Sequence, residues 1–184
     1  SYDKGSVFLH QLSYVTGQQA FDKGMLDYFD TWKFRHPNPN DFTRCMEKAS
    51  GLELDWYKEY FVNTTHSPDY AIDSLKPDAG KGSVAILSRI GRMPMPVDVS
   101  VTTLDGKNFL YSIPLDIMRG AKPLEKEGTN FTVAPDWMWV QPTYELALPF
   151  PVGQIKTIEI DPSLRLADIN RADNLFPAKP VGTE

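Results

Sequence analysis

Apolar side chains recur every three or four residues through the first third of the chain, the spacing that places them on one face of a helix. In the opening stretch Val7, Phe8, Leu12 and Val15 fall near one such face, and Thr16-Gly17 is a stop signal. The pattern predicts a helix that starts with the first residues of the sequence and ends at the glycine.

Three more helices follow from the same spacing. The second covers about 18–33 and ends before Pro37-Asn38-Pro39-Asn40, because proline cannot donate to a helix. Asn40 or Asp41 is expected to cap the third, which closes at Ser50-Gly51, and the fourth covers about 54–62. Short helices with short connections predict an antiparallel helical array.

From Tyr70 onward the apolar period changes to two, which is the period of a strand. Asp105-Gly106 between two such stretches is a strong hairpin signal. The candidate strands are 84–87, 97–102, 110–113, 138–140, 144–148 and 155–160. Short strands separated by turns predict a β-sandwich of about a hundred residues.

The two periods divide the chain into parts. We expect an α+β protein with a helical segment at 1–68, an antiparallel β-sandwich at 69–172 and a coil tail at 173–184. The tail is placed in coil because it has little periodicity and contains prolines.

Composition narrows the classes of partner. The 184 residues are 41% hydrophobic and carry a net charge of −5, with no block of Lys or Arg. Nucleic acids and anionic membranes both need clustered cations, so neither is expected as a partner. No apolar stretch approaches the roughly 20 residues that span a bilayer. A cytoplasmic and a periplasmic or secreted location both stay open.

Side chains that bind metals or act as nucleophiles are sparse. His10, His36 and His66 are far apart, and no H-E-x-x-H or cysteine pair exists, so this chain is not expected to hold zinc by itself. Cys45 lies in a helical pattern and is interpreted as a reduced core thiol. The carboxylates at residues 47, 53, 55 and 59 are interpreted as a solvated helix face.

Four motifs follow one another in the first third of the sequence. Each is weak alone, but their order and spacing together are fairly specific. They are Tyr2-x-Lys4-Gly5, Phe21-x-x-Gly24-x-x-x-Tyr28, Asp41-Phe42-x-x-x-Met46-Glu47-x-x-Ser50-Gly51 and the aromatic stretch from Trp56 to Phe61. Together they resemble the segment after the zinc site in the gluzincin zinc aminopeptidases, the aminopeptidase N and leukotriene hydrolase-like family. The later stretches 93–97 and 159–170 look like parts of the sandwich domain that follows in those enzymes.

The resemblance implies a chemistry that this chain holds only in part. It implies the end of a thermolysin-like catalytic domain, a zinc cofactor in the parent enzyme, a peptide substrate and Tyr2 as the catalytic residue that stabilises the oxyanion. Because H-E-x-x-H is absent, we expect a C-terminal fragment that is inactive without the missing catalytic and N-terminal domains.

One alternative and one further expectation remain. The alternative is a stand-alone β-sandwich binding module with a helical cap, which recognises protein or carbohydrate. The further expectation concerns Val7, Phe8, Leu9, Leu12 and Tyr14 of the first helix, some of which would be uncovered in a fragment. An exposed apolar face of that size predicts self-association through the first helix.

Overall fold

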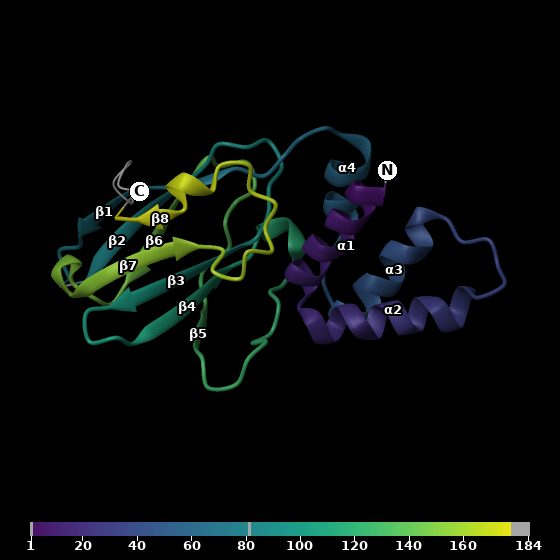
Figure 1. The fold of residues 1–184 in the computed structure, drawn as a ribbon, viewed down its shortest axis with the longest axis horizontal. Helices are drawn as coiled ribbons and strands as arrows, with labels where there is room; N and C mark the ends of the chain where they lie inside the picture. Colours follow the sequence, from purple (N-terminus) through teal and green to yellow (C-terminus); the bar gives the residue numbers. More distant parts are fainter. Residues whose placement is uncertain (1, 81, 178–184) are drawn as a thin grey trace, which may run out of the picture.

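The computed structural model describes residues 2–80 and 82–177, and for Tyr2 the backbone alone. Four α-helices precede the strands: α1 (Tyr2–Thr16), α2 (Gln18–Trp32), α3 (Pro39–Ser50) and α4 (Asp55–Asn63). The helices gather at one end of the molecule and the sheets at the other (Figure 1). The predicted α+β fold, a helical array followed by a β-sandwich, is confirmed. Within the described ranges no helix is both long and apolar enough to cross a membrane.

Local backbone chemistry sets the helix boundaries. Gly17, with φ of 82°, separates α1 from α2 in a conformation that glycine adopts without strain. The cap of α3 is Asn38, not Asn40 or Asp41 as expected. The Asn38 side chain accepts from the N–H groups of Asn40 and Asp41, while the Asp41 carboxylate accepts from Asn38 N–H at 2.9 Å. This reciprocal capping box lets Pro39 occupy the first turn, where its missing N–H costs nothing.

The strands form two sheets. One has the order β1-β2-β6, from β1 (Tyr70–Pro77), β2 (Ser83–Arg89) and β6 (Thr143–Leu148). The other has the order β5-β4-β3-β7-β8, from β5 (Asn130–Val133), β4 (Asn108–Ile113), β3 (Val97–Thr103), β7 (Ile155–Ile160) and β8 (Leu175–Phe176). The hairpin predicted at Asp105-Gly106 joins β3 to β4, with Gly106 at φ of 83°.

The structure departs from the expected strands in several places. Residues 138–140 form no strand. Trp139 N–H donates to the Asp116 carboxylate and Gln141 N–H donates to Met138 O, so these backbone groups are not available to pair with a neighbouring strand. Strand β5 lies parallel to β4, so the sandwich is not wholly antiparallel. The tail expected as coil contains β8, which pairs with β7, while residues 178–184 are not among those described.

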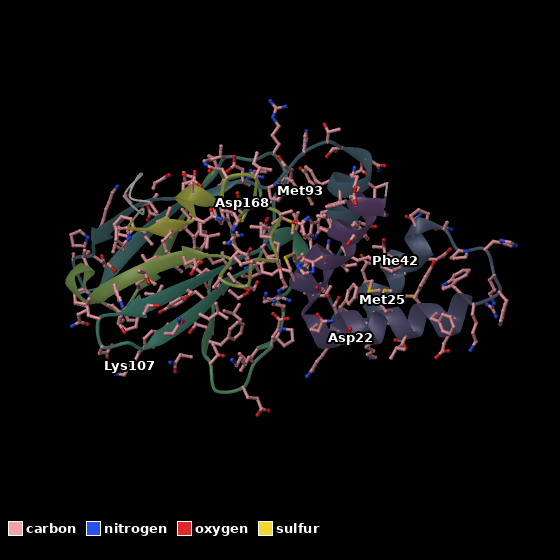
Figure 2. All side chains as sticks on the ribbon, in the orientation of Figure 1. Asp22, Met25, Phe42, Met93, Lys107 and Asp168 are labelled. Atoms are coloured by element: carbon pink, nitrogen blue, oxygen red, sulfur yellow. The ribbon has the colours of Figure 1, made fainter. Side chains whose placement is uncertain are left out.

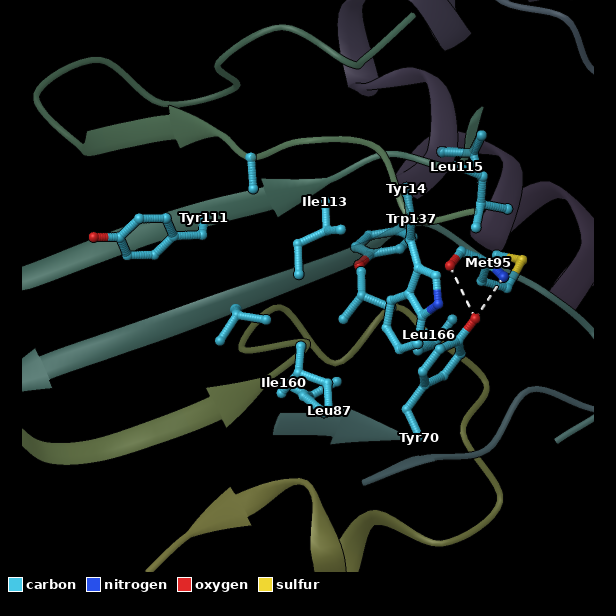
Figure 3. Packing of buried hydrophobic residues seen from close by; sticks show 14 of the residues in the cluster. Tyr14, Tyr70, Leu87, Met95, Tyr111, Ile113, Leu115, Trp137, Ile160 and Leu166 are labelled. Carbon is cyan, nitrogen blue, oxygen red and sulfur yellow. Dashed lines mark hydrogen bonds between the residues drawn. The ribbon is translucent and has the colours of Figure 1, made fainter. Parts of the chain in front are cut away.

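The main core lies between the two sheets and continues under the helices (Figure 3). Tyr70 is fully buried, and its hydroxyl accepts from Met95 N–H at 2.7 Å and donates to Met95 O at 2.9 Å. The ring of Trp137 meets the Tyr70 ring edge-on, with centroids 5.6 Å apart. Trp137 Nε1–H donates to Gln141 O at 3.0 Å, so the polar groups of both rings are paired where the apolar rings fill the core.

Candidate functional site

The first turn of α1 carries the residue that the sequence singles out. Tyr2 begins the helix, but its side chain is not among the described groups, so its predicted role stays a prediction. Asp3 in the same turn complements the positive end of the helix dipole. Lys4 and Gly5 are exposed on the next positions.

A groove of about 320 Å³ adjoins this turn and is lined by Lys4, Gly5 and Phe8 of α1 and by Phe61 and Val62 of α4. The Lys4 ammonium lies 5.6 Å from the centroid of the Phe61 ring and 3.4 Å from the carbonyl oxygen of the residue after α4. The space above Gly5 is open, since an added Cβ would meet no atom within 4 Å. The groove therefore offers an apolar floor with one cation at its rim.

Aromatic packing holds α1 against α4 beneath the groove. The Phe8 ring stacks on Tyr57 with centroids 5.0 Å apart and meets Phe61 edge-on at 5.3 Å. The Tyr57 hydroxyl donates to Phe8 O at 2.7 Å. Burial raises the pKa of Tyr57 well above its usual value, so this hydroxyl stays a protonated donor.

The other end of α1 is fastened to the sandwich by a buried polar cluster of Tyr14, Asp98 and Lys122. Asp98 N–H donates to the Tyr14 hydroxyl at 2.8 Å, and Lys122 donates to the Asp98 carboxylate at 2.5 Å and to Tyr14 O at 3.2 Å. The Lys122 ammonium also lies 4.0 Å from the centroid of the Tyr14 ring. Burial, and then the charges of Asp98 and Asp161, raise the pKa of Tyr14 well above its usual value.

A second contact supports this cluster from the surface. Arg165 forms a two-pronged ion pair with Glu125, whose carboxylate also accepts from Gln18 N–H at 3.1 Å, at the start of α2. The sandwich therefore fixes the direction of α1, and with it the position of the Tyr2 backbone. No sequence pattern indicates these residues, because cluster partners such as Asp98 and Tyr14 lie 84 positions apart.

The histidines are not brought together. His36 and His66 lie in exposed connections as expected, and His10 is also exposed on α1. Across residues 2–80 and 82–177 no group of three or more His, Cys, Asp or Glu side chains is arranged to hold a metal ion. The described residues therefore do not fit a zinc site.

Two other sequence candidates have structural roles in the helical array. Cys45 is half-buried between α2 and α3, and burial raises the pKa of its thiol, which makes it a weaker nucleophile. The Glu47 carboxylate, expected on a solvated face, accepts from Leu54 N–H at 2.9 Å. That bond satisfies a backbone donor next to α4.

A second cavity, of about 390 Å³, lies at the end of the sandwich far from the helices, where Figure 2 labels Lys107. The Phe109 and Phe150 rings form one side, with centroids 4.7 Å apart. The ion pair between Lys107 and Asp105, at 2.8 Å, and the Gln154 side chain form the polar side.

Comparison with known proteins finds a family model that matches the helical part. The family model of the "Peptidase family M1 domain" matches residues 1–61, which fall on α1–α4. Aminopeptidase N of Escherichia coli (strain K12) is 24% identical over 93 residues, 50% of this chain and 11% of that protein. A probable aminopeptidase 2 of Sulfurisphaera tokodaii is 25% identical over 141 residues, 74% of this chain and 16% of that protein.

The chain thus spans between 11% and 16% of the length of these curated relatives. The second match extends beyond the helices, since 141 residues exceed the length of the helical part. These matches support a relationship between this chain and the M1 aminopeptidase family.

Proposed function

We propose that this chain contributes to the removal of N-terminal residues from peptides by a zinc-dependent M1-type aminopeptidase. The observation that carries the proposal is the match of residues 1–61 to the peptidase M1 domain. That stretch covers α1–α3 and most of α4, and it includes all the groove residues except Val62. The β-sandwich then serves as the support that orients α1.

Tyr2 is the residue to which we assign a chemical role. Its phenol keeps its proton at neutral pH and donates one hydrogen bond to the oxyanion that forms when a peptide carbonyl is attacked. Two contacts farther along α1 support this role: Tyr57 donates to Phe8 O near the middle of the helix, and Asp98 N–H donates to the Tyr14 hydroxyl near its end. A donor of this kind acts best when it does not have to reorganise during the reaction.

The zinc of such an enzyme supplies Lewis-acid activation of the carbonyl or of water. The described residues of this chain offer no ligand set for it, so no step in this chain is assigned to the metal. In our proposal, the ligands and the general base come from polypeptide that the 184 residues do not include.

The isolated chain tests the first half of the proposal. We expect it to hydrolyse no aminoacyl anilide and to retain less than stoichiometric zinc after dialysis, because it has no H-E-x-x-H. One zinc per chain, or turnover that a chelator abolishes, would contradict this assignment. Reading the coding sequence upstream of residue 1 for H-E-x-x-H tests the origin of the missing ligands.

The Tyr2→Phe variant tests the second half, in a polypeptide that contains an H-E-x-x-H segment. Removal of one oxyanion donor is expected to lower kcat by about 10²–10³-fold with little change in KM. A variant with unchanged kcat would remove Tyr2 from the mechanism. Phe is the matched replacement because it keeps the ring and deletes only the donor.

A second function stays open because of the distal cavity. Its paired Phe109 and Phe150 rings and the neighbouring polar groups suit a small ligand with one apolar face, as a stand-alone binding module needs. Titration with soluble oligosaccharides and short peptides, followed by the chemical shifts of Phe109 and Gln154, tests this function. No shift at either residue would reject it.

A further inference from the structure

Three aspartates gather where the segment after β7 returns to the start of β1. Asp69 directly precedes β1, Asp168 follows β7, and Asp173 ends the short 3₁₀ helix Arg171–Asp173. The Asp168 carboxylate joins the two segments, because it accepts from Tyr70 N–H at 3.0 Å and from the Asn174 side-chain amide at 3.2 Å. Figure 2 labels Asp168 on the side of the sandwich that faces the helices.

This cluster has more negative charge than its neighbours compensate. Among the residues that the structure describes, none of the three carboxylates forms an ion pair. Burial, and then the charges of Asp168 and Asp173, raise the pKa of Asp69. Burial also raises the pKa of Asp173, to which the charges of Asp168 and Asp73 add.

Independently of charge, several buried side-chain oxygens in this cluster accept no hydrogen bond from the described protein groups. Asn174 is only 2% exposed, and its Oδ1 has no hydrogen-bond partner among the described protein groups, although its Nδ2 is held by Asp168. One buried oxygen of Asp69, which is 9% exposed, and one of Asp173 are unpartnered in the same way. A buried acceptor without a donor is costly, and a cluster of several calls for an ion, a proton or water.

We propose that Asp69, Asp173 and Asn174 bind a hard divalent cation, with Ca²⁺ the best match to the donor set. The three unpartnered atoms are all oxygens, the ligand type that Ca²⁺ prefers. The irregular coordination shell of Ca²⁺ accepts amide and backbone carbonyl oxygens together with carboxylates. The carboxylates do not form a metal-binding group by themselves. The buried Asn174 oxygen is therefore the necessary third side-chain ligand, and water or backbone oxygens complete the shell.

Binding at this point would fasten two distant segments of the chain. The segment 168–176 packs on β1 through Asp168 and β8, and a cation shared by Asp69 and Asp173 adds a link between them. Because the unfolded chain does not hold these groups together, binding stabilises the folded state. At a free Ca²⁺ concentration of a hundred times the Kd, the folding equilibrium constant should rise about a hundredfold.

The test is calorimetric titration of CaCl₂ into the whole chain after EDTA treatment, paired with thermal unfolding. We expect one site per chain with a Kd between about 10 μM and 1 mM, and weaker binding of Mg²⁺, which demands a smaller and more regular shell. Calcium should raise Tm by several degrees. No heat and no change in Tm, or an equal response to Mg²⁺, would overturn the proposal.

Three variants locate the site. Asp69→Asn and Asp173→Asn should each weaken Ca²⁺ binding at least tenfold, and without calcium they should unfold at the same or a higher temperature, because each removes repulsive charge. Asp136→Asn removes an exposed carboxylate from another loop and should change neither property. Calcium binding that survives in both cluster variants would place the ion elsewhere and overturn the proposal. If one variant fails to fold, the other decides.

Discussion

Lys122 brings a positive charge into the interior at the junction of α1 and the sandwich. Its side chain is 5% exposed and that of Asp98 is 6% exposed, so both charges have left water. Their attraction offsets this desolvation only while both partners are present. The pair is therefore sensitive to the loss of either member.

The Lys122→Met variant should destabilise the chain by about 3–5 kcal/mol, because it leaves the Asp98 carboxylate buried and unpaired. Urea unfolding measures the loss. Lys126→Met, at an exposed position four residues later, is the matched control and should change little.

The double variant Lys122→Met/Asp98→Asn separates the lost pair from lost packing. Because it removes both charges, it should recover part of the stability that Lys122→Met loses. Equal losses in the single and double variants would show that the stem of Lys122, and not its charge, accounts for the effect.

At the scale of elements, close backbone contacts decide how the connection after α4 meets the sandwich. Gly91 follows β2, and its N–H donates to Asp69 O at 2.9 Å. An added Cβ at Gly91 would overlap Ser67 O and lie 2.5 Å from Asp69 N. These atoms belong to the backbone, so they cannot move aside as a side chain would.

We predict that Gly91→Ala destabilises the chain by about 1–3 kcal/mol, since the backbone must shift to admit the methyl group. Gly153→Ala is the control, because its Cβ would meet no atom within 4 Å. Thermal unfolding of both variants beside the parent chain checks the prediction. Equal stability of the two variants would contradict the close approach seen at Gly91.

At the scale of the whole molecule, apolar side chains remain exposed on the helical end. Some of five α1 side chains were expected to be uncovered, but two of the five, Leu12 and Tyr14, are 2% and 1% exposed because the chain's own residues cover them. Val7 of α1 is 39% exposed, and Val62 of α4, which lines the groove, is 52% exposed. Leu26 and Phe29 of α2, and Phe34 after it, are also exposed.

Self-association through α1 stays a prediction, with Val7 of α1 and Val62 of α4 as the exposed apolar side chains that test it. We expect sedimentation to show concentration-dependent association that Val7→Asp/Val62→Asp abolishes, because charge at these positions opposes apolar contact. Leu26→Asp/Phe29→Asp on α2 is the matched comparison. Loss of association only in the α2 variant, or a parent chain that is monomeric at every concentration, would reject the α1 interface.

Several parts of this structure follow from the sequence because their causes are local. Gly17 ends α1 and Asp105-Gly106 turns the β3–β4 hairpin because each choice depends on a few neighbouring dihedrals. The change of apolar period places helices before Asn63 and strands after Tyr70. The motifs between Tyr2 and Phe61 likewise indicate the peptidase family from sequence alone, and the M1 domain model matches residues 1–61.

The tertiary structure alone decided which polar groups lose contact with water. Lys122, a lysine in a polar stretch of sequence, is buried because Tyr14 and Asp98 close around it. The oxygens near Asp168 that lack a partner within residues 2–80 and 82–177 arise in the same way, from two segments about a hundred positions apart. Burial and charge compensation depend on the surfaces that meet when the chain folds, and one residue's neighbours in sequence do not specify those surfaces.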